Sequence, residues 1–299
     1  MPIFRHLLGV VTTLLFVVLT CAVILPILVL AVFKVALPFP RWQALCNRML
    51  DWLASLWMEA NARHQQFLLP TQLDIHGLDN LSTREWYMMV ANHQSWVDIL
   101  LLLRIFNGRI PYLKFFLKRS LIWVPLLGLA WWALDFPFMH RHTKAQIARD
   151  PSLQGKDIEQ TRKACEKFRH NPVTIINFLE GTRYTHEKYT QQKSSYRHLL
   201  MPKAGGLAFT LAAMDGQLHR LLDVTIYYPA GIPTYWDYAC GRVKEIRVHI
   251  RQLPIPAELI GDYIEDAEFR AGFQQWVNQL WREKDDLIDS MTEVHQKIS

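Results

Sequence analysis

The sequence predicts an α/β fold, a sheet flanked by helices, with an apolar helix or hairpin at the amino terminus. Short apolar runs of strand type alternate with longer segments of helical period along most of the chain, which is the pattern of α/β domains. No internal repeat, low-complexity tract or long linker divides the 299 residues. Residues 1–40 are mostly apolar, so we expect a membrane anchor at 1–40 and one domain at 41–299.

The amino-terminal segment is long enough to cross a membrane. Residues 7–33 carry no charged side chain, and as a helix at ~1.5 Å per residue they would extend about 40 Å. A bend at Pro26 would instead give a re-entrant hairpin. A cleaved signal peptide usually has a shorter apolar region that ends at small residues, whereas this one continues into Lys34. Lys34, Arg41 and Arg48 follow the run, so the positive-inside tendency places the body in the cytoplasm.

Charge and cysteine usage limit the classes of partner. The formal net charge is +6, and basic residues are interleaved with acidic ones without forming a block. Beside an apolar anchor this charge favours an anionic lipid surface over nucleic acid, and an ordinary solvated surface is the alternative. The four cysteines form no Cys-x-x-Cys pair, which favours reduced thiols over disulfides or a zinc site.

Periodicity and turn residues assign the remaining elements. Predicted strands are 73–76, 86–91, 111–116, 173–178 and 221–228, with an alternating edge strand at 242–252. Predicted helices are 41–69, 99–105, 129–134, 157–170, 207–214 and the amphipathic 269–288. The tryptophans of 41–69 suit either a membrane interface or a helix facing the core. Residues 184–196 are polar and aperiodic, which predicts a loop over the functional site.

The first polar motif lies between predicted strand 86–91 and predicted helix 99–105. It contains His93 and, five residues later, Asp98, and open α/β sheets place their chemistry at strand ends. Imidazole is the natural general base at neutral pH, and a carboxylate can orient it and stabilise the imidazolium. We therefore expect proton removal by His93 with help from Asp98. A structural turn histidine capped by Asp98 is the alternative.

Other roles for this motif have less support. Ser95 stands beside His93, but no Gly-x-Ser-x-Gly elbow surrounds it, so a serine acyl-enzyme is not favoured. No His or Cys lies at ligand spacing from His93, which argues against a metal. A thioester is already activated, so acyl transfer from it to a hydroxyl needs a base and no protein nucleophile.

The second polar motif is the tetrapeptide Glu180-Gly181-Thr182-Arg183, which follows predicted strand 173–178. Glycine lets the backbone approach a ligand closely, and the arginine fork suits a phosphate. Glu180 can accept a hydrogen bond from a substrate hydroxyl or hold Arg183. A surface turn with a local ion pair is the alternative. Two further cationic candidates, each of which alone could be a solvated surface charge, are Arg141 and Lys203.

Taken in order, these motifs resemble those of the glycerolipid (lysophospholipid) acyltransferases, especially the 1-acyl-sn-glycerol-3-phosphate acyltransferases. Segment 92–98 is similar to the family's His-x4-Asp catalytic motif, and 180–183 is similar to its Glu-Gly-Thr-Arg block, which binds glycerol phosphate. Segments 118–128 and 138–141 resemble its second block, whose arginine is associated with the substrate phosphate. The resemblance runs from about residue 40 to 290.

Further segments narrow the resemblance. Residues 222–229 lie where the family has an apolar strand ending in proline, and 131–135, 163–169 and 275–276 are similar to the bacterial YihG-type subgroup. One departure concerns Lys203. Many members follow the Glu-Gly-Thr-Arg block with a short Ser-rich turn and a Lys-Gly pair, whereas a longer polar insert precedes Lys203 here. The role of Lys203 is therefore open.

The resemblance implies a glycerolipid-acyltransferase-like sheet with an apolar tunnel for the acyl chain, in an acyltransferase domain at 41–299. The implied enzyme moves a fatty acyl group from acyl-CoA or acyl carrier protein to the sn-2 hydroxyl of 1-acyl-sn-glycerol 3-phosphate, forming phosphatidic acid without a cofactor or metal. His93 would be the base and Asp98 its orienting carboxylate. The implied substrate-binding residues are Glu180, Gly181, Thr182, Arg183, Arg141 and Lys203.

The same resemblance, together with the anchor, implies a bacterial inner-membrane enzyme whose catalytic domain faces the cytoplasm. Two alternatives stay open. The acceptor could be another lysophospholipid or an amphiphilic alcohol or amine, because the sequence indicates residues that would bind a phosphate but none that would recognise another part of a headgroup. A membrane-tethered scaffold without activity is the alternative of a different class, and the intact pair of His93 and Asp98 argues against it.

Overall fold

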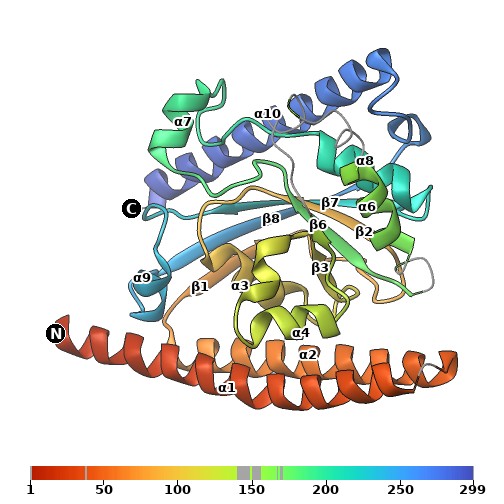
Figure 1. The fold of residues 1–299 in the computed structure, drawn as a ribbon. Helices are drawn as coiled ribbons and strands as arrows, with labels where there is room; N and C mark the ends of the chain where they lie inside the picture. Colours follow the sequence, from red (N-terminus) through yellow and green to blue (C-terminus); the bar gives the residue numbers. More distant parts are fainter. Residues whose placement is uncertain are drawn as a thin grey trace.

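The computed structural model describes residues 2–37, 39–139, 149, 156–166, 168 and 171–298. Its body is a six-stranded sheet of order β1-β8-β7-β2-β6-β3, with helices covering both faces (Figure 1). The strands are β1 Gln72–His76, β2 Tyr87–Ala91, β3 Leu113–Phe115, β6 Thr174–Phe178, β7 Arg220–Tyr227 and β8 Glu245–Pro254, and a separate small sheet pairs β4 Leu117–Lys118 with β5 Phe138–Met139. The predicted α/β fold is confirmed.

The sheet is mixed, and its register brings several strand ends to one edge. Strands β2, β3, β6 and β7 run parallel, so their carboxyl ends lie together. Strand β8 is antiparallel to β7 and parallel to β1. The predicted edge strand at 242–252 is therefore wrong in position, since β8 lies inside the sheet. Its polar positions are covered by ion pairs: Arg251 binds Asp223 of β7 and Glu283.

The helices confirm most of the predicted pattern. They are α1 Pro2–Ala36, α2 Pro40–Leu68, α3 Val97–Phe106, α4 Leu127–Ala133, α6 Lys156–Glu166, α7 His186–Gln192, α8 Gly205–Met214, α9 Tyr235–Ala239 and α10 Ala267–Ile298, with short 3₁₀ helices η1 Arg119–Trp123 and η3 Ala257–Leu259. The carboxyl end of predicted helix 157–170 falls partly outside the described residues. The predicted loop at 184–196 contains α7, because the Thr185 side chain accepts a hydrogen bond from the Lys188 amide and caps a helix too short to show a period.

Helices α1 and α2 lie side by side along one flank of the body (Figure 1). Helix α1 passes through Pro26 without a break, so the alternative of a hairpin bent at Pro26 is wrong. Residues 3–36 are long and apolar enough to cross a membrane by length and composition. The boundary between the two helices lies close to the predicted division at residue 40, and the independence of the two parts stays a prediction.

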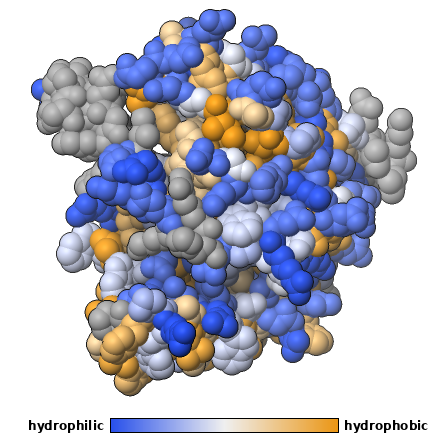
Figure 2. Space-filling view, turned by 90° about the vertical axis from the view of Figure 1, so that its right-hand side faces the viewer, coloured by the Kyte–Doolittle hydropathy of each residue, from blue (hydrophilic) through white to orange (hydrophobic). Residues whose placement is uncertain are grey.

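The tryptophans of α2 divide between the two roles considered for them. The indole Nε1 of Trp42 donates to Phe33 O, and that of Trp57 donates to Thr20 Oγ1, so both contact α1. Trp52 is 63% exposed. Seen from the side, hydrophobic side chains gather at the lower edge, at the end where α1 leads into α2, below a mostly hydrophilic body (Figure 2). The exposed residues at this end are Phe33, Val35, Leu37 and Phe39.

The core has a layer on each face of the sheet. Alternate residues of β2 enter the two layers, with Met88 and Val90 packing toward α6, α8 and α10, and Tyr87 and Met89 packing toward α3. Such alternation is the period of a strand buried on both faces. A third apolar cluster joins α1, α2 and α4. Strand β2 is thus held firmly on both sides just before the first motif begins.

Candidate active site

His93 and Asp98 meet at the carboxyl end of β2. The His93 Nδ1 atom lies 2.9 Å from Asp98 Oδ2, and the Asp98 side chain is fully buried. Asp98 stands in the first turn of α3, where the helix dipole favours a negative charge. The backbone amides of Gln94 and Ser95 donate to the same Oδ2 at 2.6 and 2.8 Å. The five-residue spacing therefore folds the carboxylate back onto the turn that carries the imidazole.

A residue that the sequence did not indicate completes the surroundings of Asp98. The Tyr228 hydroxyl donates to Asp98 Oδ1 at 2.5 Å, and Tyr228 is buried directly after β7. Burial, together with the negative charge of Asp98, raises the pKa of Tyr228 well above its ordinary value. Asp98 thus receives hydrogen bonds from four donors, as an acceptor-only carboxylate can. Tyr228 lies in the segment that resembled the family's apolar strand, but no local signal marked its contact.

The imidazole of His93 is oriented on two sides. Its ring stacks on Phe178 at the end of β6, with ring centroids 4.0 Å apart and planes at 17°. Its side chain is 12% exposed. When Nδ1 donates to Asp98, the Nε2 lone pair is free to accept a proton. The geometry is that of a general base with a fixed tautomer.

The buried side chain of Glu180 connects the two motifs. Its side chain is fully buried; Oε2 accepts a hydrogen bond from the His93 amide at 2.6 Å, and Oε1 accepts one from the Leu200 amide at 2.9 Å. Burial raises the pKa of Glu180 to about 8. The structure gives Glu180 a positioning role, holding the backbone of His93, that the sequence did not predict. Its contact with a substrate stays a prediction.

The rest of the tetrapeptide lies against the His93 turn. Gly181 has φ of +69°, a left-handed conformation that favours glycine. The Arg183 guanidinium lies over the Trp96 ring, with Cζ 4.3 Å from the centroid, and Trp96 is 56% exposed. The Tyr184 amide donates to His93 O at 2.7 Å. The structure therefore brings Arg183 next to the turn that carries His93. Trp96, which Arg183 contacts, is a second site residue that the sequence did not indicate.

Of the remaining candidate residues, the structure brings only some to the site. The Lys203 amide donates to Leu179 O at 2.7 Å, and its Nζ lies 3.3 Å from the point where a Cβ on Gly181 would stand, so Lys203 joins the tetrapeptide. Arg141 lies outside the described residues. The Ser95 hydroxyl donates to Pro233 O at 2.6 Å, which commits it to the backbone. Among the described residues, no group of three His, Cys, Asp or Glu side chains is arranged to hold a metal.

The family follows from a comparison with known proteins. A family model described as Acyltransferase matches residues 72–228, which is more than half of the chain. The chain belongs to the acyltransferase family. The matched part of this acyltransferase runs from β1 to Tyr228 and contains both polar motifs.

Curated relatives of the acyltransferase are similar at low identity. An uncharacterized acyltransferase of Schizosaccharomyces pombe is 25% identical over 74% of this chain and 64% of its own length. A probable 1-acyl-sn-glycerol-3-phosphate acyltransferase 5 of Arabidopsis thaliana is 26% identical over 58% and 47%, and lysocardiolipin acyltransferase 1 of Danio rerio is 25% identical over 79% and 60%. The chain thus spans 47% to 64% of these relatives' lengths.

A solved structure shares the fold. The crystal structure of the 1-acyl-sn-glycerophosphate acyltransferase of Thermotoga maritima is similar with a TM-score of 0.54 and 18% identity, over 95% of this chain and 97% of that chain. At this identity the likeness shows the fold alone. The resemblance to the YihG-type subgroup stays a prediction.

Proposed function

We propose that this acyltransferase moves a fatty acyl group from acyl-CoA or acyl carrier protein to the sn-2 hydroxyl of 1-acyl-sn-glycerol 3-phosphate, forming phosphatidic acid. The observation that carries the proposal is the oriented pair of His93 and Asp98, with the cationic Arg183 loop bound to the same turn. An oriented base and a phosphate-binding cation are what acylation of a phosphorylated alcohol requires.

The proposed chemistry needs no protein nucleophile. His93 Nε2 removes the proton of the acceptor hydroxyl as its oxygen attacks the thioester carbonyl carbon. The new C–O bond forms, the C–S bond breaks, and the proton passes from the imidazolium to the departing thiolate. Asp98 stabilises the imidazolium between these two transfers.

The proposed phosphate site lies at Arg183, beside the turn that carries His93. Stacking on Trp96 occupies one face of the Arg183 guanidinium and leaves the N–H groups around its edge to bind two phosphate oxygens at once. Gly181 and Thr182 belong to the same loop and are proposed to contact the phosphate. Arg141 is proposed as a further phosphate-binding residue from the resemblance alone.

A series of packed aromatic side chains leads from His93 toward the amino-terminal helices. From His93, a series of ring contacts runs through Phe178, Phe115 and Phe136 to Tyr112, with successive centroids 4.0, 6.3, 6.3 and 5.9 Å apart. Tyr112 also lines a small, mostly apolar cavity of about 70 Å³ between α1, α2 and α4. We propose that the acyl chain lies along this series of aromatic side chains, directed toward α1 and α2.

The acceptor and the location are part of the proposal. One long apolar helix, α1, supports association with a membrane, where the lipid substrate and product reside, and we propose an inner-membrane enzyme facing the cytoplasm. A different lysophospholipid acceptor is the second candidate, because relatives bear the names lysocardiolipin acyltransferase and 2-acyl-1-lysophosphatidylinositol acyltransferase.

A product assay tests the proposal. Detergent-purified protein would be given acyl-CoA or acyl-loaded carrier protein, together with 1-acyl-sn-glycerol 3-phosphate or another lysophospholipid, and the esters formed would be separated by mass. Phosphatidic acid from wild type is the expected result. An ester formed only from another acceptor would support the second candidate, and no ester from any pair would favour the inactive scaffold.

A further inference from the structure

Two basic side chains approach the loop 180–183 from outside and join its own Arg183, and one of the two was not a candidate in the sequence. Lys188 of α7 directs its Nζ back to this loop, donating to Thr182 Oγ1 at 2.7 Å and to Arg183 O at 3.0 Å. An ammonium has three N–H donors. Two of them are used by the loop, so one remains for a ligand.

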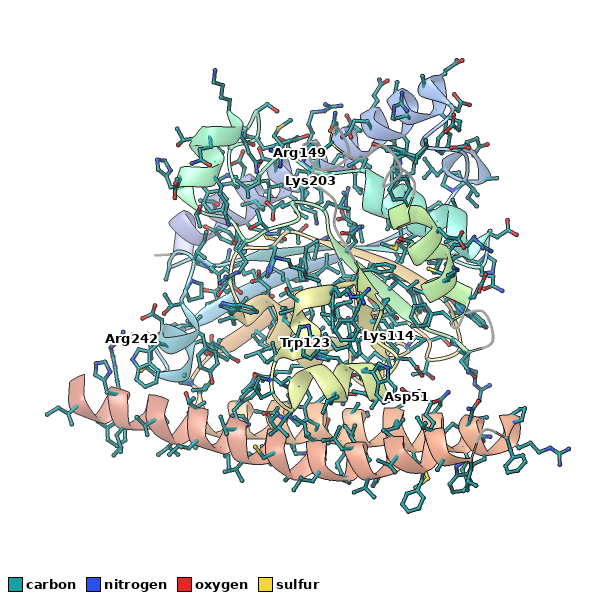
Figure 3. The ribbon with its side chains drawn as sticks, viewed as in Figure 1. Asp51, Lys114, Trp123, Arg149, Lys203 and Arg242 are labelled. Carbon is teal, nitrogen blue, oxygen red and sulfur yellow. The ribbon has the colours of Figure 1, made fainter. Side chains whose placement is uncertain are left out.

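Lys203, which comes after α7 in the chain, also reaches the loop. Its Cδ and Nζ atoms each lie 3.3 Å from the position of a Cβ on Gly181. Lys203 lies on the side of the sheet that carries α7 and α10 (Figure 3). With Arg183 on the Trp96 ring, two ammonium groups and one guanidinium gather at residues 181–183.

Within the described residues, these three cations have no carboxylate partner. Some basic groups elsewhere in the described chain are paired with carboxylates; Lys284 binds Asp223, and Arg197 binds Asp286. The one acidic residue of the loop, Glu180, is buried, and its two oxygens accept hydrogen bonds from the His93 and Leu200 amides rather than from a cation. Arg183, Lys188 and Lys203 therefore bring three cationic groups to the edge of the site, and no described carboxylate forms an ion pair with them.

This charge exceeds what a phosphate diester would balance. A diester carries one negative charge, whereas a phosphate monoester carries about 1.5 to 2 at pH 7, since its second pKa is near 6. A monoester also offers a third terminal oxygen to a further donor. Arg183 can take two oxygens, which leaves the third for an ammonium group.

We propose that Lys188, together with Lys203 at the same loop, forms the part of the site that selects an acceptor with a phosphate monoester over one with a phosphodiester headgroup. The assignment rests on the proposed function and adds acceptor selectivity to it. Lys188 lies in the longer polar insert that precedes Lys203, at the place where many members of the resembled family have a short Ser-rich turn. In this proposal the insert contributes a residue to the binding site and is more than a loop that covers it.

The test compares two acceptors that differ only in the headgroup. Initial rates would be measured for 1-acyl-glycerol 3-phosphate and 1-acyl-glycerophosphoglycerol, with the same acyl-CoA, for wild type and Lys188→Met. We expect kcat/KM of the variant for the monoester to fall about tenfold or more, mainly through KM, as for loss of one charge-assisted hydrogen bond. The diester should change by less than about threefold, and Lys188→Arg should keep most of the preference.

The pH dependence gives a second readout. Between pH 5.5 and 7.5 the monoester acquires its second charge, so KM of wild type for it should fall across this range, whereas KM of Lys188→Met should fall less steeply, because one of the three cations is missing. Lys244, an exposed lysine just before β8, supplies the matched control; Lys244→Met should behave as wild type. Melting temperatures would establish that each variant is folded.

Two results would overturn the assignment. Equal losses on both acceptors would mean that Lys188 only shapes the loop, and a wild type that prefers the diester would mean that the cations serve another purpose. Absence of product from every acceptor is a different result, because it would overturn the proposed function itself.

Discussion

At the scale of single residues, the decisive group is the Asp98 carboxylate. Its four donors come from the imidazole of His93, two amides of the turn and the hydroxyl of Tyr228. The amides fix the position of Oδ2, and the hydroxyl draws charge toward Oδ1. Tyr228 therefore modulates how strongly Asp98 can stabilise an imidazolium on His93.

Removing the tyrosine hydroxyl should alter the base without removing it. In Tyr228→Phe, the charge on Asp98 concentrates on the oxygen that faces His93, which favours the protonated imidazole. We expect the acidic limb of the kcat/KM–pH profile to move to higher pH and kcat at neutral pH to fall about tenfold. A full profile for both proteins is the measurement. An unchanged limb would show that the hydroxyl only fills space.

Glu180 should give stability a pH dependence of known sign. Its pKa rises from 4.5 to about 8 on folding, so the folded state binds more protons. Its contribution to stability is then greatest below pH 4.5 and declines as pH rises toward 8. We expect the stability advantage of wild type over Glu180→Gln to shrink between pH 5.5 and 8.5 in urea unfolding. A constant difference would contradict the raised pKa.

At the scale of elements, α10 is attached to β7 by a buried charge. Lys284 and Asp223 are both fully buried with Nζ and Oδ1 2.6 Å apart, and the same Nζ donates to Val224 O and Thr225 Oγ1. Strand β7 leads directly to Tyr228. The buried pair thus lies beneath the strand that delivers a donor to the catalytic carboxylate.

Breaking this pair should destabilise the protein. Lys284→Met leaves Asp223 and two acceptors of β7 without the ammonium, and removing one partner of a buried pair costs about 3–5 kcal/mol. The free energy of unfolding from denaturant titration is the measurement, with Arg63→Met on the exposed face of α2 as control. A loss below about 1 kcal/mol would mean that water replaces the ammonium. Adding Asp223→Asn should restore part of the loss.

Local elements could be predicted from the sequence better than their partners. His93 and Asp98 lie within one strand-turn-helix unit, so their spacing sufficed to predict the contact. Tyr228 lies 130 residues from Asp98, and its contact depends on β7 pairing with β2, which no local pattern encodes. The position of β8 inside the sheet was hidden because Arg251 and similar polar residues are covered by ion pairs. The positioning role of Glu180 was not predicted, because the local sequence does not distinguish a buried carboxylate that binds backbone amides from one at the surface.

At the scale of the whole molecule, α3 and α4 lie between the sheet and a layer formed by α1 and α2 (Figure 1). The outer face of α1 is apolar, and Leu14 and Val18 are each 59% exposed. Exposure of so many large apolar side chains marks an interaction surface, and under the proposed membrane location its expected partner is lipid. The proposed route for the acyl chain ends at this layer.

Charges placed on that face should detach the protein from lipid. We expect Leu14→Glu combined with Val18→Glu to lower sedimentation with anionic vesicles several-fold while turnover on detergent-dispersed substrate persists, because neither residue touches the site. The matched control is Gln191→Glu on α7, which should sediment as wild type. Undiminished sedimentation of the double variant would place the lipid contact elsewhere.

The central claim, that His93 is the base of an acyl transfer, has one direct test. Phosphatidic acid formation would be measured for wild type and His93→Ala at saturating donor and acceptor, with melting curves to establish folding. Loss of the base should lower turnover by ~10²–10⁴-fold with the fold intact. Turnover of the folded variant within a few-fold of wild type would remove His93 from the mechanism and contradict the account.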